Sequence, residues 1–237
     1  MTMKTPIVIL HGWGLSGDRY EELQKIFEKK GYVVYAPDFP GFGGKKLLKP
    51  VMDLDDYVGF VCDLLKKEEV KKAIFIGHSF GGRVATKLAY EHPHLVEKLI
   101  LTGAPVIREP LSLKKKLIGV ISRTAKKILS YSPISVVEFL SWIAYRIIGE
   151  WDYFKAGEMR PTFVKIINED LSEILPSISA KTLLVWGEYD ALVPAAIGKR
   201  ASHRMQNAVY VEIPLATHKL PYEKPSLFAQ TVLEFIS

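Results

Sequence analysis

The sequence has almost no cysteine and no long apolar run. Its 237 residues include one cysteine, Cys62, which cannot form an internal disulfide and lies on the apolar side of a predicted helix. We expect a small core residue in a protein of a reducing compartment. No run approaches the roughly 18 apolar residues of a membrane-spanning helix, and the apolar run at 7–10 is too short for a secretion signal. The expected location is cytoplasmic, with no membrane span.

Clusters with metal-ligand spacing, internal repeats and nucleic-acid-binding motifs are also missing. We therefore expect no metal, no organic cofactor and no nucleic-acid partner, although the formal net charge is +6. Basic side chains gather in one helical stretch, which could lie on a membrane surface. The favoured interpretation is a solvated helix face. These side chains are Lys114, Lys115, Lys116, Arg123, Lys126 and Lys127.

Short apolar runs alternate with amphipathic helical patterns along most of the chain. This alternation is typical of a parallel sheet covered by helices on both faces. The predicted strands lie at 6–10, 32–36, 73–76, 99–102, 183–186 and 209–213. The predicted helices lie at 19–30, with Asp18 as N-cap, at 53–68, at 83–91, and from Pro225 onward. We predict an α/β fold in a single domain over 1–237.

The alternation is interrupted at 106–176, where the spacing is helical and no strand is evident. We predict a helical cap inserted between the fourth and fifth strands. Apolar and aromatic residues are abundant there, including Phe139 and Trp142, and we expect these two to line a substrate pocket.

The segment Gly77-His78-Ser79-Phe80-Gly81 follows a buried strand and precedes a helix. This is the context of the G-x-S-x-G signature, in which the serine is a nucleophile. The turn is so tight that Ser79 must have a strained backbone, and the two glycines avoid Cβ collisions. A glycine-rich turn that merely holds a serine is the alternative, and the flanking strand and helix favour the nucleophile.

A serine nucleophile requires a base, and the base requires an orienting carboxylate. Asp190 follows the fifth predicted strand and His218 the sixth, in the chain order that suits a Ser79 nucleophile. Glu188 is the local rival of Asp190, and Asp170 is a weaker one. The remaining histidines are poorer candidates for the base because they lie in helices, at a helix end or inside other motifs: His11, His78, His92, His94 and His203.

Acyl transfer also requires N–H donors for the oxyanion. The backbone N–H of Phe80, directly after the nucleophile, is one predicted donor. The second is the backbone N–H of Trp13, in the loop after the first strand. The Trp13 side chain is expected to shape the acyl pocket, while also being compatible with a core aromatic.

Five motifs in this order resemble the α/β-hydrolase family over nearly the whole chain. They are His11–Gly14, Asp38–Gly43, Gly77–Gly82, Gly187–Pro194, and His218 followed by Glu223-Lys224-Pro225. The first two resemble small bacterial carboxylesterases with a helical cap. The resemblance implies a mostly parallel sheet of eight strands. The strand at 6–10 matches the third of these, so we expect about six strands, with the first two absent.

These features together predict a serine hydrolase that cleaves carboxylic esters with an apolar acyl group. The predicted catalytic residues are Ser79, His218 and Asp190, and the predicted partner is a small-molecule ester. Family members that open epoxides or displace halide resemble this chain but use aspartate as nucleophile, and Ser79 argues against those activities. A lactonase or C–C bond hydrolase with the same three residues stays open, as does a ligand-binding member with slow or no turnover.

Overall fold

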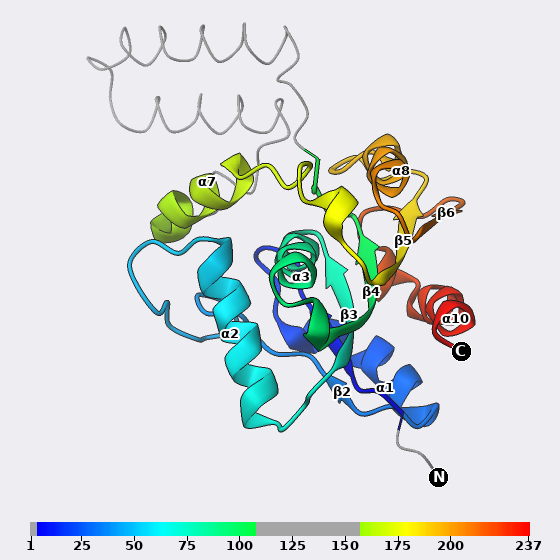
Figure 1. Ribbon diagram of the computed structural model, residues 1–237, viewed down its shortest axis with the longest axis horizontal. Helices are drawn as coiled ribbons and strands as arrows, with labels where there is room; N and C mark the ends of the chain where they lie inside the picture. The colour runs from blue at the N-terminus through cyan, green and yellow to red at the C-terminus, as the bar shows by residue number, and fades with distance from the viewer. Residues whose placement is uncertain (1–3, 108–156) are drawn as a thin grey trace, which may run out of the picture. The chain divides into compact units, whose positions relative to one another are not determined.

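The computed structural model describes residues 4–107 and 157–237 (Figure 1). Residues 4–107 and 165–237 belong to one compact unit, and residues 157–164 belong to a second. The predicted insertion at 106–176 lies largely outside the described residues, as do Phe139, Trp142 and the basic side chains at 114–127. Its bounds and its role as a cap therefore stay predictions.

The described residues form one six-stranded sheet in the order β2-β1-β3-β4-β5-β6. Every neighbouring pair of strands is parallel. The strands are β1 (Ile7–Leu10), β2 (Val34–Tyr35), β3 (Ala73–His78), β4 (Val96–Thr102), β5 (Lys181–Gly187) and β6 (Ala208–Ile213). Each begins and ends within a few residues of its predicted position, so the predicted parallel sheet of about six strands is confirmed.

Helices follow the strands and pack on both faces of this sheet (Figure 1). The α-helices of the described residues are α1 (Glu21–Lys29), α2 (Leu54–Lys67), α3 (Phe80–Glu91), α7 (Arg160–Asn168), α8 (Ala195–Arg204), α9 (Leu220–Glu223) and α10 (Pro225–Ile236). Short 3₁₀ turns are η1 (Gly17–Tyr20), η2 (Pro93–Leu95), η4 (Gly157–Met159) and η5 (Leu175–Ser177).

Alternate side chains of the central strands face opposite layers of helices. Ile7 and Ile9 of β1 pack in one buried cluster with Phe27 of α1 and Phe228 of α10. Their neighbours in β1 point to the other face, where α2 packs on α3. All four residues of β1 and all six of β3 are buried, so these strands have no polar face. Burial of each large apolar side chain contributes roughly 1.5–3 kcal/mol to stability.

The start of the first helix differs from the prediction. Asp18 is not an N-cap: it lies inside η1 and accepts a hydrogen bond from the Ser16 hydroxyl, and α1 begins only at Glu21. A tertiary contact explains the difference. The N–H of Gly17 donates to Asp38 Oδ1 at 2.7 Å, and a Cβ at Gly17 would lie 1.9 Å from the carbonyl oxygen of Ala36. Packing against the chain after β2 therefore sets the geometry of this turn.

The direction of the strand order reverses between β1 and β3. From β1 the chain passes through α1 to β2 on one side, whereas β3 pairs with the other side of β1. The helices that follow these two strands, α1 and α3, lie on opposite faces of the sheet (Figure 1). Ligands of open parallel sheets bind at such a reversal of strand order. The loop at 11–14 and Ser79 both lie at this place.

Candidate active site

Ser79 occupies a sharp turn between β3 and α3. Its backbone has φ 52° and ψ −114°, a region that L-residues other than glycine rarely adopt, and it is the N-cap of α3. Its N–H donates to the carbonyl of Thr102 at 2.9 Å, and its carbonyl accepts from Gly82 N at 3.0 Å. The strained serine backbone that the sequence predicts is confirmed. The helix begins at once at Phe80, three residues before the predicted start.

Both glycines of the motif are required by close approaches of the backbone. A Cβ at Gly77 would lie 2.5 Å from Gly82 Cα, and a Cβ at Gly81 would lie 2.1 Å from the carbonyl oxygen of Leu10. The N–H of Gly81 donates to the carbonyl of His11 at 3.0 Å. The first turn of α3 is therefore pressed against the end of β1, and no larger side chain fits there.

Asp190 and His218 form a hydrogen-bonded pair. Asp190 Oδ2 lies 2.8 Å from His218 Nδ1, and the exposed fraction of the Asp190 side chain is 1%. The other carboxylate oxygen, Oδ1, accepts from the N–H groups of Leu192 and Val193 at 3.0 and 2.8 Å. These bonds fix the carboxylate, so that it holds the imidazole in one orientation.

The two rival carboxylates of the sequence analysis have other partners. Glu188 is exposed, and its Oε2 accepts from the N–H of Leu215 at 3.0 Å, in the loop that leads to His218. Asp170 Oδ1 accepts from the N–H of Ser172 at 3.0 Å. Of the three carboxylates, Asp190 is the one that the structure pairs with the histidine.

Gly103 connects this pair to the serine turn, and the sequence analysis did not select it. It follows Thr102, the acceptor of the Ser79 N–H, and has φ 56°. A Cβ at Gly103 would lie 2.7 Å from two ring atoms of His218 and 3.2 Å from Asp190 Oδ2. The three candidate residues thus meet around the chain at 102–103. A glycine directly after a strand is the signal that could have found it.

The loop after β1, which contains Trp13, is held by His11. Phe39 N donates to His11 Nε2 at 2.9 Å, so the proton of the neutral imidazole is on Nδ1, which donates to the carbonyl of Gly12 at 2.8 Å. Burial lowers the pKa of His11 and keeps it neutral. The carbonyl of His11 in this loop accepts from Gly81 N in the first turn of α3 at 3.0 Å. The N–H groups of Trp13 and Phe80 as oxyanion donors stay predictions.

Aromatic rings surround the serine turn on the side of this loop. The Trp13 ring meets Phe42 and Phe80 edge to face, with centroids 4.9 and 5.5 Å apart. Phe80 also packs edge to face on Tyr57 and, tilted, on Phe39. Trp13 is half-buried, whereas the phenylalanines are buried. Phe139 and Trp142, the other two predicted pocket residues, lie outside the described residues.

Arg83 ties α3 to the chain on both sides of the undescribed residues. Its guanidinium donates to the carbonyls of Pro105, Ile166 and Glu169, the second at 2.8 Å. Burial lowers the pKa of Arg83 to about 10, which leaves it charged at neutral pH. The serine turn and the stems that follow β4 and precede β5 are therefore held by one side chain.

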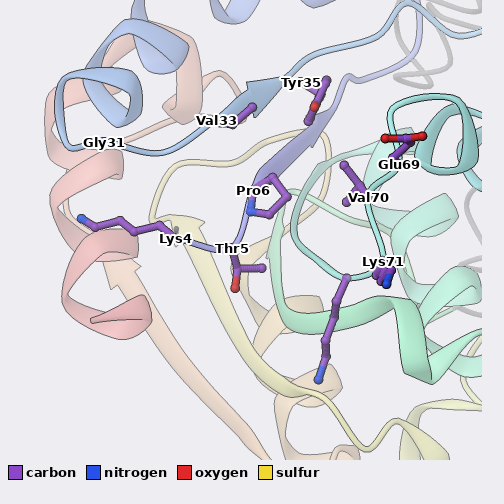
Figure 2. Close-up of a pocket in the computed structure, with 10 residues that line it drawn as sticks. Lys4, Thr5, Pro6, Gly31, Val33, Tyr35, Glu69, Val70 and Lys71 are labelled. Carbon is purple, nitrogen blue, oxygen red and sulfur yellow. The ribbon is translucent and has the colours of Figure 1, made fainter. Parts of the chain in front are cut away.

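A groove of about 640 Å³ lies at the other end of the sheet, between the segments that precede β1, β2 and β3. Figure 2 shows its lining, with Pro6, Val33 and Val70 among the labelled residues. These residues are at the amino ends of the strands, whereas Ser79 and His218 follow carboxyl ends. The groove is therefore separate from the candidate active site.

The alpha/beta hydrolase family matches residues 7–231 of the sequence. The chain belongs to this family. A solved structure of a hydrolase from Pseudomonas aeruginosa has the same fold, with a TM-score of 0.75 at 23% identity over 100% of this chain and 91% of that chain. The expected α/β-hydrolase fold is thereby confirmed.

Relatives with named activities cover nearly the whole chain. A pimeloyl-[acyl-carrier protein] methyl ester esterase of Shewanella woodyi is 29% identical, over 90% of this chain and 86% of its own length. A 2-hydroxy-6-oxononadienedioate/2-hydroxy-6-oxononatrienedioate hydrolase of a Pseudomonas species is 25% identical, over 98% of this chain and 87% of its own length. Relatives at similar distance from this chain thus include both a methyl ester esterase and a hydrolase of 2-hydroxy-6-oxo acids.

Residues 4–107 and 157–237 contain no group of three or more His, Cys, Asp or Glu side chains that could hold a metal ion. In the same part of the chain, no helix is long and apolar enough to cross a membrane.

Replacement of Gly103 by alanine is expected to displace the His218 ring. The new Cβ would collide with the ring, so the hydrogen bond between His218 Nδ1 and Asp190 should weaken, and its downfield proton NMR resonance should shift or disappear. The matched control is Gly44→Ala, which has the same kind of backbone, φ 81°, with no atom within 4 Å of the added Cβ. An unchanged resonance in Gly103→Ala would contradict the packing described here.

Acid is expected to destabilise the fold through its buried histidines. Burial lowers the pKa of His78 from 6.5 to about 3. Between pH 6.5 and pH 3, therefore, this histidine binds a proton in the unfolded chain but not in the folded chain. The contribution of His78 to the free energy of unfolding is fully present above about pH 6.5. It falls as the pH is lowered toward 3, with a slope of up to about 1.4 kcal/mol per pH unit. The groups that face His78 are His218, His11, Tyr20 and Tyr222.

Urea unfolding at several pH values measures this slope. His78→Gln should reduce the slope between pH 6 and 4, and His94→Gln, which removes an exposed imidazole, is the matched control. Equal slopes in the wild type and His78→Gln would show that His78 is not held neutral by burial.

Proposed function

We propose that this chain is a serine-dependent hydrolase of carboxylic esters with an apolar acyl group. The observation that carries the proposal is the pair of His218 and Asp190, 2.8 Å apart, beside the strained turn of Ser79. A nucleophile, a base and an orienting carboxylate in this arrangement are the requirements of nucleophilic acyl transfer. The named ester hydrolases among the relatives support the choice of bond.

In the first half of the reaction, Ser79 Oγ attacks the ester carbonyl carbon. Asp190 engages His218 Nδ1, so Nε2 is the nitrogen that accepts the Ser79 proton. The C=O π bond gives its electron pair to the oxygen, and the backbone N–H groups of Trp13 and Phe80 stabilise this oxyanion. When the carbonyl re-forms, the C–O bond to the alcohol breaks and the alcohol leaves with the proton from Nε2.

In the second half, water attacks the acyl-enzyme. Its proton passes to His218 Nε2, a second oxyanion forms, and the bond to Ser79 breaks as the serine recovers its proton. The acid is released and the site returns to its starting state. Asp190 remains ionised throughout and stabilises the imidazolium form of His218. Every bond and proton is accounted for by the side chains of this chain and one water.

The surroundings of Ser79 favour an apolar acyl group. The rings of Trp13, Phe42 and Phe80 form one wall beside the turn. Such a wall binds acyl chains by burial of apolar surface and offers no charge to fix an amine. We expect Phe139 and Trp142 to extend this lining, as the sequence predicts.

Carbon–carbon bond hydrolysis is the second candidate, because the Pseudomonas relative named above carries out that reaction type. The same serine and histidine would then act on a 2-hydroxy-6-oxo-dienoate. A larger kcat/KM for such a substrate than for every ester of a chain-length series would favour this candidate over the ester hydrolase. A lactone series tests the related ring-opening activity.

Ser79→Ala should abolish hydrolysis of p-nitrophenyl esters from acetyl to palmitoyl. Loss of a triad nucleophile lowers kcat by roughly 10⁶-fold, so the variant should be inactive within detection. Ser226→Ala, an exposed serine of α10, is the control and should keep wild-type rates. Equal turnover by wild type and Ser79→Ala would overturn the proposal. Tight ligand retention without turnover in the wild type would favour a binding protein.

Asp190→Asn should lower kcat by about 10⁴-fold, as this change does in a serine-protease triad, because the amide favours the wrong imidazole tautomer. Glu188→Gln is the matched control. It keeps an oxygen that can accept from Leu215 N, so it should retain most of the activity. The comparison is made from kcat values on one ester. The reverse ranking would make Glu188 the orienting carboxylate.

A further inference from the structure

His78 lies between the loop that contains Trp13 and the loop that contains His218. It is the last residue of β3, directly before Ser79, and only 1% of it is exposed. Its two ring nitrogens have partners in different segments. Nδ1 is 2.6 Å from the Tyr20 hydroxyl, and Nε2 is 2.9 Å from the backbone carbonyl oxygen of His218.

The directions of these hydrogen bonds follow from the groups themselves. A carbonyl oxygen only accepts, so the Nε2 of His78 carries the proton and donates to His218. Burial keeps the imidazole neutral, so Nδ1 is a bare acceptor and the Tyr20 hydroxyl must donate to it. The Tyr20 oxygen is then free to accept from the N–H of Gly12, 3.2 Å away. One chain of three bonds runs from Gly12 through Tyr20 and His78 to His218.

The topology of the sheet explains why this series of hydrogen bonds is needed. The segments that carry Trp13 and Ser79 follow neighbouring strands, β1 and β3, whose pairing fixes their relative position. The segment of His218 follows β6, which is at the edge of the sheet with β4 and β5 in between. It must reach back across two strands, and the sheet itself does not hold it beside Ser79.

We propose that His78 is a positioning residue, which holds the loop of Gly12 and Trp13 and the backbone of His218 in place beside Ser79. The proposal rests on the function proposed above. Its physical basis is that each N–H and O–H of the three bonds has one acceptor and that His78 Nδ1, which carries no proton, has one donor, so the protons can be placed in one way only. A Cβ at Gly12 would lie 3.0 Å from His78 Nδ1, so the loop that contains Gly12 packs directly against the His78 ring.

Aromatic packing protects these three hydrogen bonds from water. Tyr20 and Tyr222 lie edge-on to each other, with ring centroids 5.8 Å apart, and both meet the His78 ring edge-on. The His218 ring is also close, with its centroid 4.8 Å from that of His78. A dry environment strengthens each hydrogen bond and raises the cost of breaking one.

Tyr20→Phe tests the proposal by removal of one oxygen. Gly12 N loses its acceptor and His78 Nδ1 loses its donor, while the aromatic ring stays. We expect kcat on a p-nitrophenyl ester to fall tenfold to a hundredfold, since a small misplacement of catalytic groups has effects up to about 10²-fold. KM should change much less, because the acyl wall is intact. Tyr222→Phe, which removes a hydroxyl outside the chain of three bonds from the neighbouring ring, should stay within about twofold of wild type.

A second pair of variants separates positioning from simple stability. In His78→Gln the amide N–H can still donate to the His218 carbonyl, whereas His78→Leu has no donor. We expect His78→Gln to retain at least tenfold more kcat than His78→Leu when the two have equal melting temperatures. Equal kcat values for Gln and Leu, or for Tyr20→Phe and Tyr222→Phe, would overturn the proposal.

Imidazole ¹⁵N NMR of the wild-type protein gives a readout that needs no turnover. The spectrum should assign a proton to His78 Nε2 and none to Nδ1, unchanged from pH 8 to 5, and Tyr20→Phe should shift the Nδ1 resonance. A proton on Nδ1 would overturn the proposed chain of bonds even in an active enzyme. The expected tautomer in a protein that hydrolyses no ester would instead reject the proposed function and leave the hydrogen-bond chain standing.

Discussion

Between β3 and α3 the backbone passes through a left-handed conformation at Ser79, and this turn depends on close contacts that only glycine allows. Gly81 packs against the carbonyl of Leu10, so the first turn of α3 lies on the end of β1. The strain at Ser79 is offset by the hydrogen bonds of its own N–H and carbonyl, to Thr102 and Gly82. The same contacts bring the loop after β1 beside the serine.

The other half of the site has a different origin. His218 comes from the edge of the sheet, and its position is set by side chains rather than by strand pairing. Asp190 holds the ring, Gly103 leaves room for it, and His78 donates to the backbone carbonyl of His218. Each of these partners lies at the carboxyl end of a different strand. The sheet therefore places the three partners, and their contacts place His218.

Most of the fold follows from local patterns in the sequence. The buried strands β1 and β3 are short apolar runs that end in turn residues, and the helices between them have apolar faces at helical spacing. Such patterns involve residues that are close in the sequence, so the sequence alone predicts these elements. The exception at α1 is instructive. Asp18 has the sequence position of an N-cap, but Gly17 is fastened to Asp38, and a contact between distant segments overrides the local preference.

The sequence by itself determined the sheet, the serine turn and the identity of the residues after β5 and β6, because spacing and turn chemistry act over a few residues. Only the tertiary structure decided that Asp190 rather than Glu188 pairs with His218, since both carboxylates follow the same strand and only the folded chain buries Asp190 beside the histidine. The tertiary structure also decided the partners of His78. In the sequence it is a polar residue within an apolar strand, and its hydrogen bonds join residues 58 and 140 positions away. Contacts over such separations depend on how the whole sheet is folded, and no local pattern encodes them.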